Sequence, residues 1–226
     1  ANRIINFAQA QLGAVPAIAA LLLMVRQGLP YLVAVPLALI GGGLLGGAVE
    51  VGVVRRFQSA SRVVLTVATV GVGLLLLVLE FVVKNAITGD LLVVDRVTTP
   101  FGRLQWDVGA VRARRVPTAT TTVTLRGDHV VTVVVAVGTL LALTAFFRRT
   151  RMGTAIRAAA ENRDRAASLG IPVDRVSMVV WALAGVLSAV GVFLRAPLVG
   201  LPLSGFVGPF FLLYGLTVAV IARMDR

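Results

Sequence analysis

Residues 63–83 read VVLTVATVGVGLLLLVLEFVV, a stretch whose only charged side chain is Glu80. A run of about 20 apolar residues matches the hydrocarbon thickness of a bilayer when it is helical. Because lipid offers the backbone no hydrogen-bond partner, such a run crosses the membrane as a helix and not as an open strand. The stretch therefore predicts a membrane-spanning helix.

Similar apolar blocks lie on both sides of this stretch, at residues 7–25, 29–54, 130–147, 176–194 and 206–222. The whole chain is 58% hydrophobic and 14% charged, with a mean hydropathy of +0.92. Soluble domains carry about a quarter charged residues. The chain is therefore predicted to be an all-α, polytopic transmembrane helix bundle of about six apolar segments, forming one domain over residues 1–226.

Two of these blocks have unusual composition. The first follows Asn6, contains Gln9 and Gln11, and is interrupted by Pro16. Two alternatives stay open for it: a broken or re-entrant helix that lines a cavity, or a helix whose polar end lies at the interface. The second block is rich in glycine, and we expect close helix packing there because small residues let backbones approach in lipid.

The net charge of +12 does not indicate a nucleic-acid-binding protein, because the basic residues lie between apolar blocks and there are only two Trp and two Tyr. This placement suits contact with membrane lipid. The chain has no cysteine, and its one histidine, His129, lies at the start of an apolar block, where we expect an interfacial side chain. No metal site and no cofactor are predicted.

The connections between blocks predict the orientation. Residues 148–175 hold seven arginines, and the short connection at Arg55, Arg56 and Arg62 falls on the same side if every block spans. The positive-inside rule assigns that side to the cytoplasm. Residues 84–128 are then an extracytoplasmic loop, in which the threonine- and valine-rich part at 118–124 favours a short hairpin within irregular chain.

The cytoplasmic segment, RRTRMGTAIRAAAENRDRAASLGIPVDR at 148–175, predicts one short helix. Thr154 is a suitable N-cap, and the helix would end near Leu169, with Gly170 as the left-handed residue before Pro172. Ala155, Ala159, Asn162, Ala166 and Leu169 would share one face at helical spacing. Such a face suits docking into a groove of another protein, whereas a solvated or membrane-surface connector is the alternative.

The same segment also carries a family resemblance. Residues 152–175, with Ala160-Glu161-Asn162, Ala166 and Gly170-Ile171, resemble the coupling loop of the branched-chain amino acid permease family of ABC importers. The string Ile5-Asn6-Phe7-Ala8-Gln9 is similar to that family's Asn-Phe-Ala signature. Where the family usually has glycine, this chain has Ala10.

The resemblance implies a plasma-membrane permease subunit that is not itself an enzyme. Its implied partners are cytoplasmic ATP-binding subunits, a second related permease and an extracytoplasmic solute-binding protein. Coupling to the ATPase would use Ala155, Ala159, Glu161, Asn162, Ala166 and Gly170. In agreement, the chain has no phosphate-binding loop of its own. We also expect further spans on both sides of this sequence in the native protein.

Polar residues inside spans are candidates for a solute pathway. Here they are Asn6, Gln9, Gln11, Thr66 and Thr69. Glu80, near the outer end of its block, is expected at the interface beside Lys84, and Glu50 is expected to pair with basic residues at the inner interface. A secondary transporter or channel, and a membrane anchor or assembly subunit, remain alternatives. Amino acids, amides and urea all stay open as solutes.

Overall fold

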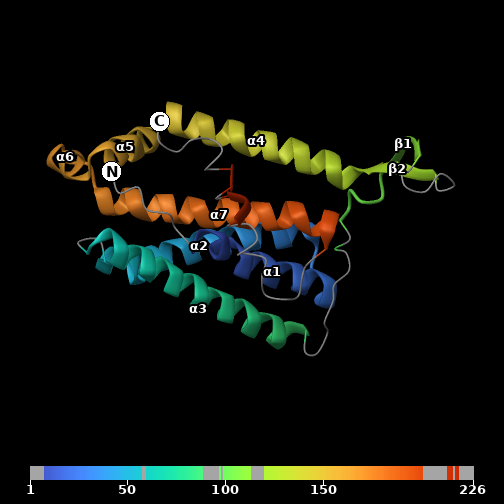
Figure 1. Ribbon diagram of the computed structural model, residues 1–226, viewed down its shortest axis with the longest axis horizontal. Coiled ribbons are helices and arrows are strands. Elements are labelled where there is room, and N and C mark those ends of the chain that lie inside the picture. The colour runs from blue at the N-terminus through green and yellow to red at the C-terminus, as the bar shows by residue number, and fades with distance from the viewer. Residues whose placement is uncertain are drawn as a thin grey trace.

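The computed structural model describes residues 8–57, 60–88, 97, 99–112, 120–200, 213–215 and 217–218. Within these ranges, five helices are long and apolar enough to cross a membrane. They are α1 (Gln9–Gln27), α2 (Tyr31–Gly52), α3 (Arg62–Thr88), α4 (Gly127–Arg149) and α7 (Val173–Val199), which lie side by side in Figure 1. The predicted helix bundle is confirmed. The segment expected at 206–222 lies almost wholly outside the described residues.

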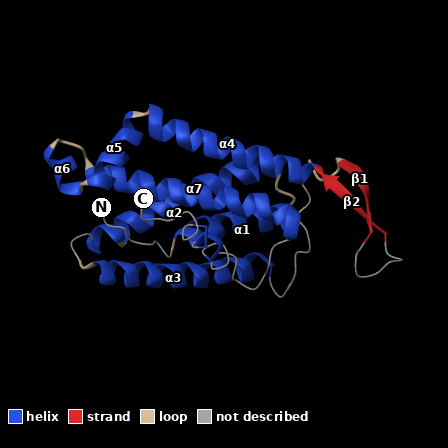
Figure 2. Cartoon of the chain, turned by 45° about the horizontal axis from the view of Figure 1, so that its top comes forward, coloured by secondary structure: helices blue, strands red, loops and turns tan. Residues whose placement is uncertain are grey.

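The smaller elements lie at the two ends of the bundle, as Figure 2 shows. The 3-10 helix η1 (Val54–Phe57) follows α2, and the short helices α5 (Arg151–Glu161) and α6 (Arg163–Ser168) connect α4 to α7. At the opposite end, β1 (Gln105–Arg112) and β2 (Thr120–Arg126) form an antiparallel hairpin in which Gln105 pairs with Arg126. We call these the α5–α6 end and the hairpin end.

The structure confirms that the two arginine-rich connections share one end of the bundle. Arg55, just after α2, and Arg163, on α6, line the same cavity of 510 Å³. The described residues between α3 and α4 lie at the hairpin end instead, and they include the expected short hairpin. Successive long helices therefore alternate in direction, as spans joined by short connections must.

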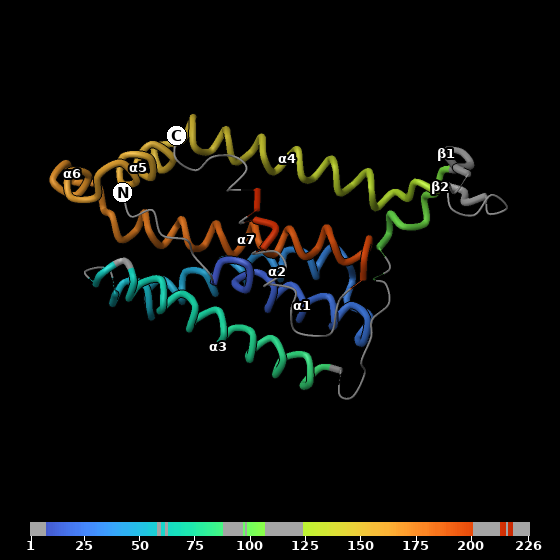
Figure 3. The backbone as a smooth tube through the Cα atoms, viewed as in Figure 1, coloured from blue at the N-terminus to red at the C-terminus, as the bar shows by residue number. Residues whose placement is uncertain are grey.

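The first apolar segment forms the centre of the bundle. Helix α1 is continuous through Pro16, so the broken form is not what the structure contains. It packs against α2, α3 and α7, as Figure 3 shows. In its most apolar 18-residue window, 61% of the residues are buried in protein, whereas the corresponding window of α4 has none. Because other helices surround α1, its side chains and backbone face protein rather than lipid. This explains why α1 tolerates glutamine and proline.

The expected close packing of the glycine-rich segment is also present. Gly42 and Gly46 of α2 are buried against the α7 backbone, at Gly185 and Trp181 respectively. A Cβ atom built on Gly42 would lie 2.6 Å from the carbonyl oxygen of Gly185, inside van der Waals contact. Gly13 of α1 approaches the same stretch of α7 at Ala189. Glycines on all three helices therefore allow their backbones to meet.

Candidate functional site

The segment predicted as one coupling helix is two helices, and its first cap differs from the expected one. Thr150, not Thr154, is the N-cap of α5: its hydroxyl accepts a hydrogen bond from the Gly153 N–H at 2.9 Å and donates one to the Phe146 carbonyl at 2.7 Å. The cap comes one turn earlier because α5 follows α4 directly, with a single extended residue between them.

Asn162 divides the segment. It has an extended backbone, and its side-chain oxygen accepts a hydrogen bond from the Arg165 N–H at 3.0 Å, so it is the N-cap of α6. Asparagine is among the best N-cap residues, and Asp164 in the first turn adds a favourable charge. These two residues were the sequence signal for the break. The continuous helix expected up to Leu169 was wrong for this reason.

The break also changes the expected alanine face. Ala155 and Ala159 on α5 are half-buried, whereas Ala166 on α6 is only 2% exposed and points into the protein. Asn162 is exposed, and Leu169 is 81% exposed. These five residues therefore do not form one continuous stripe, because a helix restarted at Asn162 loses the 3.6-residue phase of the first.

The end of the segment agrees with the prediction. Gly170 has a φ of +79°, the left-handed conformation that favours glycine. The Gly170 N–H donates to the Ala167 carbonyl at 2.9 Å and the Ile171 N–H to the Ala166 carbonyl at 3.0 Å. These two bonds form a Schellman motif, which ends α6 and turns the chain into α7.

The two short helices are held at both ends by the long helices. At one end, Gly153 of α5 lies so close to Phe146 and Phe147 of α4 that a Cβ atom would overlap their backbone. At the other, Arg163 of α6 forms an ion pair with Asp174 of α7, with Nη2 and Oδ1 3.2 Å apart. A displacement of α5 and α6 would therefore be transmitted to α4 and α7.

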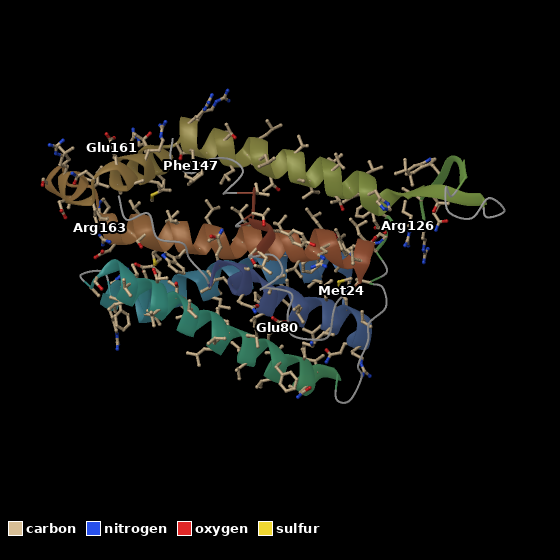
Figure 4. All side chains as sticks on the ribbon, viewed as in Figure 1. Met24, Glu80, Arg126, Phe147, Glu161 and Arg163 are labelled. Carbon is tan, nitrogen blue, oxygen red and sulfur yellow. The ribbon has the colours of Figure 1, made fainter. Side chains whose placement is uncertain are left out.

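An interhelical cavity of 470 Å³ lies near the α5–α6 end. It brings together two of the predicted pathway residues, Gln9 of α1 and Thr69 of α3. Its wall also includes Phe147, Arg163 and Trp181, which sequence reasoning did not select. Figure 4 shows Phe147 and Arg163 at this end. Aromatic and arginine residues at helix ends carry no local signal for a cavity, because the cavity exists only once distant helices meet.

The other predicted pathway residues do not line this cavity. Asn6 lies outside the described residues. Thr66 is absent from the described wall, and its carbonyl accepts a hydrogen bond from the Thr69 hydroxyl at 2.8 Å, as expected for threonines that bond their own helix. Gln11 is 3% exposed, and its amide has no hydrogen-bond partner within the described part of the chain.

Ala10, where the family usually has glycine, lies within α1, and its carbonyl accepts a hydrogen bond from the Ser188 hydroxyl at 2.6 Å.

The two acidic residues inside spans have different surroundings. Glu50 pairs with Arg55 at 3.1 Å, as predicted. Glu80 is 0% exposed, and its carboxylate oxygens accept no hydrogen bond from any residue that the structure describes. Helix α3 continues to Thr88, so Glu80 lies two turns inside the helix end, on the side facing α1 in Figure 4. Its expected place at the membrane interface stays a prediction.

A comparison with protein families matches residues 1–226 to the permease component of the branched-chain amino acid transport system. The chain belongs to this family. Membership agrees with the resemblance found in the sequence, and with five candidate spans it makes the chain an integral membrane protein of the transport permease type. No curated protein and no solved structure matches the chain.

Proposed function

We propose that this permease is the membrane-spanning subunit of an ATP-driven importer in the plasma membrane, carrying branched-chain or other small amino acids. Cytoplasmic ATP-binding subunits would dock on α5 and α6, a second related permease would complete the pathway, and an extracytoplasmic binding protein would deliver the solute. The amino acid specificity rests on the family description, and ATP hydrolysis would take place in the partners.

The position of Arg163 carries the coupling proposal. This residue belongs to α6, pairs with Asp174 of α7, and lines the cavity that also holds Gln9 and Thr69. At the other end of the two short helices, Gly153 abuts Phe147, which lines the same cavity. A partner that moves α5 and α6 would thus change the walls of the cavity without touching the solute.

The exposed surface of α5 and α6 supplies the docking site in this proposal. Leu169 is 81% exposed in a segment rich in arginine, where water rather than lipid would surround it. An apolar side chain held out by a Schellman turn suits a hydrophobic pocket on another protein. Glu161 and Asn162 are exposed on the same segment, Ala155 and Ala159 are half-buried beside them, and Ala166 and Gly170 shape the turn.

The test replaces Leu169 with aspartate in the full transporter. We expect the ATP-binding subunits to be lost on purification and uptake of labelled leucine to fall sharply, because a desolvated charge is poorly tolerated in an interface core. Leu125→Asp, at an exposed position of the hairpin, is the matched control and should keep the complex together. An intact complex with normal uptake in Leu169→Asp would refute docking at this position.

Glu80 supports a second candidate function, a secondary transporter. A fully buried carboxylate inside a span is the kind of group that couples solute movement to an ion or proton gradient. Lys84, one turn further along α3, is also buried at 5% exposure. The requirement for ATP or for an ion gradient separates the two functions, and the Glu80 variant described in the Discussion applies that test.

A further inference from the structure

Another cavity, of 670 Å³, lies at the hairpin end, opposite to the α5–α6 end. One side of it is apolar and comes from the ends of α1 and α2: Met24, Leu29 and Tyr31. The other side is polar and comes from the turn before β1 and the end of β2: Thr99, Arg103 and Arg126. Met24 and Arg126 lie at this same end in Figure 4.

The polar side has unused hydrogen-bonding capacity. Arg126 Nη2 lies 4.0 Å from Asp128 Oδ2, a long ion pair, and the Arg126 Nε is buried without an acceptor among the described residues. Asp128 is 4% exposed and already accepts a hydrogen bond from the Thr99 hydroxyl. Buried donors are almost always satisfied in folded proteins, so an unpaired guanidinium N–H beside a cavity indicates a ligand oxygen.

The lining of the cavity is positively charged, like the Arg126 side chain. Arg103 and Arg126 both line it, whereas Asp128 is the acidic side chain that the structure places beside Arg126. One carboxylate cannot neutralise two guanidinium groups, so these described residues together carry a net positive charge. A guanidinium presents its N–H groups in a planar fork that matches a carboxylate in a bidentate arrangement.

The walls of the cavity are held in place by close packing. A Cβ atom built on Gly102 would lie 2.9 Å from Asp128 Oδ2 and 3.3 Å from Arg126 Nη2, so the turn lies directly on the ion pair. Across the cavity, the Tyr31 ring makes edge-to-face contacts with Phe101 at 6.1 Å and Phe193 at 6.2 Å. A binding site with fixed walls loses less entropy when its ligand binds.

We propose that this outer cavity binds the carboxylate of a small solute with an apolar tail. Arg126 and Arg103 hold the carboxylate, and Met24, Leu29 and Tyr31 receive the tail. The inference deepens the proposed function by giving the solute an entry site, and it rests on that function only for the direction of transport. Neither the ATP-binding subunits nor ATP takes part in the binding.

The test measures how fast an arginine-specific dicarbonyl reagent modifies Arg126 and Arg103, read by mass spectrometry on the full transporter in phosphatidylcholine vesicles. The probes are 4-methylpentanoate, leucine, leucinamide and inorganic phosphate. Arg26, exposed at the same end but outside the cavity lining, is the internal control. We expect 4-methylpentanoate and leucine to slow modification of both cavity arginines, and leucinamide, which lacks the carboxylate, to leave it unchanged.

Two variants sharpen the result. In Arg126→Gln, the concentration of 4-methylpentanoate needed to protect Arg103 should rise about tenfold, since a charge-assisted hydrogen bond is lost. Arg126→Lys keeps the positive charge but loses the planar, bidentate geometry of the guanidinium. The protecting concentration should therefore lie between those of the unsubstituted protein and Arg126→Gln. The midpoint of thermal aggregation of the same preparations, unchanged from that of the unsubstituted protein, shows that both variants remain folded.

The contrary outcomes are distinct. Equal protection by leucinamide, or no protection by any carboxylate, would refute the proposal. Protection that appears only when phosphatidylglycerol is added would assign the cavity to a lipid headgroup, and protection only by the binding protein would assign it to a protein carboxylate. Because labelling needs no ATPase, failure of the Leu169 experiment leaves this one intact, and the reverse also holds.

Discussion

Gly42 of α2 and Gly185 of α7 face each other where the two helices cross, close enough that a Cβ atom on Gly42 would lie 2.6 Å from the Gly185 carbonyl oxygen. The neighbour is backbone, which cannot rotate away as a side chain can. This contact joins α2 to α7, the helix that follows α5 and α6 in the chain. It thus packs α7 closely against α2 in the bundle core.

Gly42→Leu should therefore destabilise the protein. Overpacking of a core typically costs about 1–3 kcal/mol, and a clash with backbone lies at or above the upper end. The midpoint of thermal aggregation in detergent should fall clearly. Gly71→Leu is the matched control on α3, where a Cβ atom meets nothing within 4 Å. Equal midpoints for the two variants would contradict the packing described for α2 and α7.

Gly153→Ala should uncouple ATP hydrolysis from transport while leaving the protein in the membrane. The added methyl group would overlap the backbone of Phe146 and Phe147, so α5 must shift relative to α4. We expect uptake per ATP hydrolysed to fall, measured in vesicles that contain the complete transporter. Gly138→Ala, in the middle of α4, adds the same methyl group in open space and should change nothing. A normal ratio in Gly153→Ala would show that this contact does not transmit movement.

The ion pair between Arg163 and Asp174 gives a charge-swap experiment. Both side chains are substantially exposed, at 40% and 59%, so the pair contributes only about 0–1 kcal/mol to stability. Arg163→Asp and Asp174→Arg should each lower uptake several-fold with little change in thermal stability. The double swap restores the pair and should recover most of the uptake. No recovery in the double variant would mean that Arg163 acts through the cavity alone.

Glu80→Gln separates the two candidate functions. For an ATP-driven importer the carboxylate has no transport role, so the variant should retain ATP-dependent uptake. Uptake is measured in vesicles energised by ATP alone, and then by an ion or proton gradient alone. Gradient-driven uptake that disappears in Glu80→Gln would favour the secondary transporter.

The orientation is open to a labelling test, helped by a sequence that has no cysteine. We expect a cysteine at Ser168, on α6, to resist an impermeant maleimide in intact cells and to react after permeabilisation. A cysteine at Thr124, exposed on β2, should react from outside. The opposite pattern would invert the membrane orientation argued from the arginine-rich segments.

Much of the architecture could be read from local composition. Each of the five apolar blocks at 7–25, 29–54, 63–83, 130–147 and 176–194 became a long helix, because a lipid environment leaves the backbone no other way to satisfy its hydrogen bonds. The left-handed Gly170 followed from a glycine two residues before a proline at the end of a helical segment. Cap and break signals were less decisive, since Thr150, Thr154 and Asn162 are all good N-caps and only the path of the chain selects among them.

The sequence by itself thus determined five of the long helices and their alternating direction, the end of the bundle at which the arginines gather, and the end of the α5–α6 segment. Only the tertiary structure decided that α1 is central, that Glu80 is buried, and that Gln9 and Thr69 meet Arg163 and Phe147 at one cavity. Hydropathy and capping depend on neighbours in sequence, whereas burial and cavity walls depend on contacts between residues far apart in the chain. A single sequence specifies such contacts only through the packing of all its helices together.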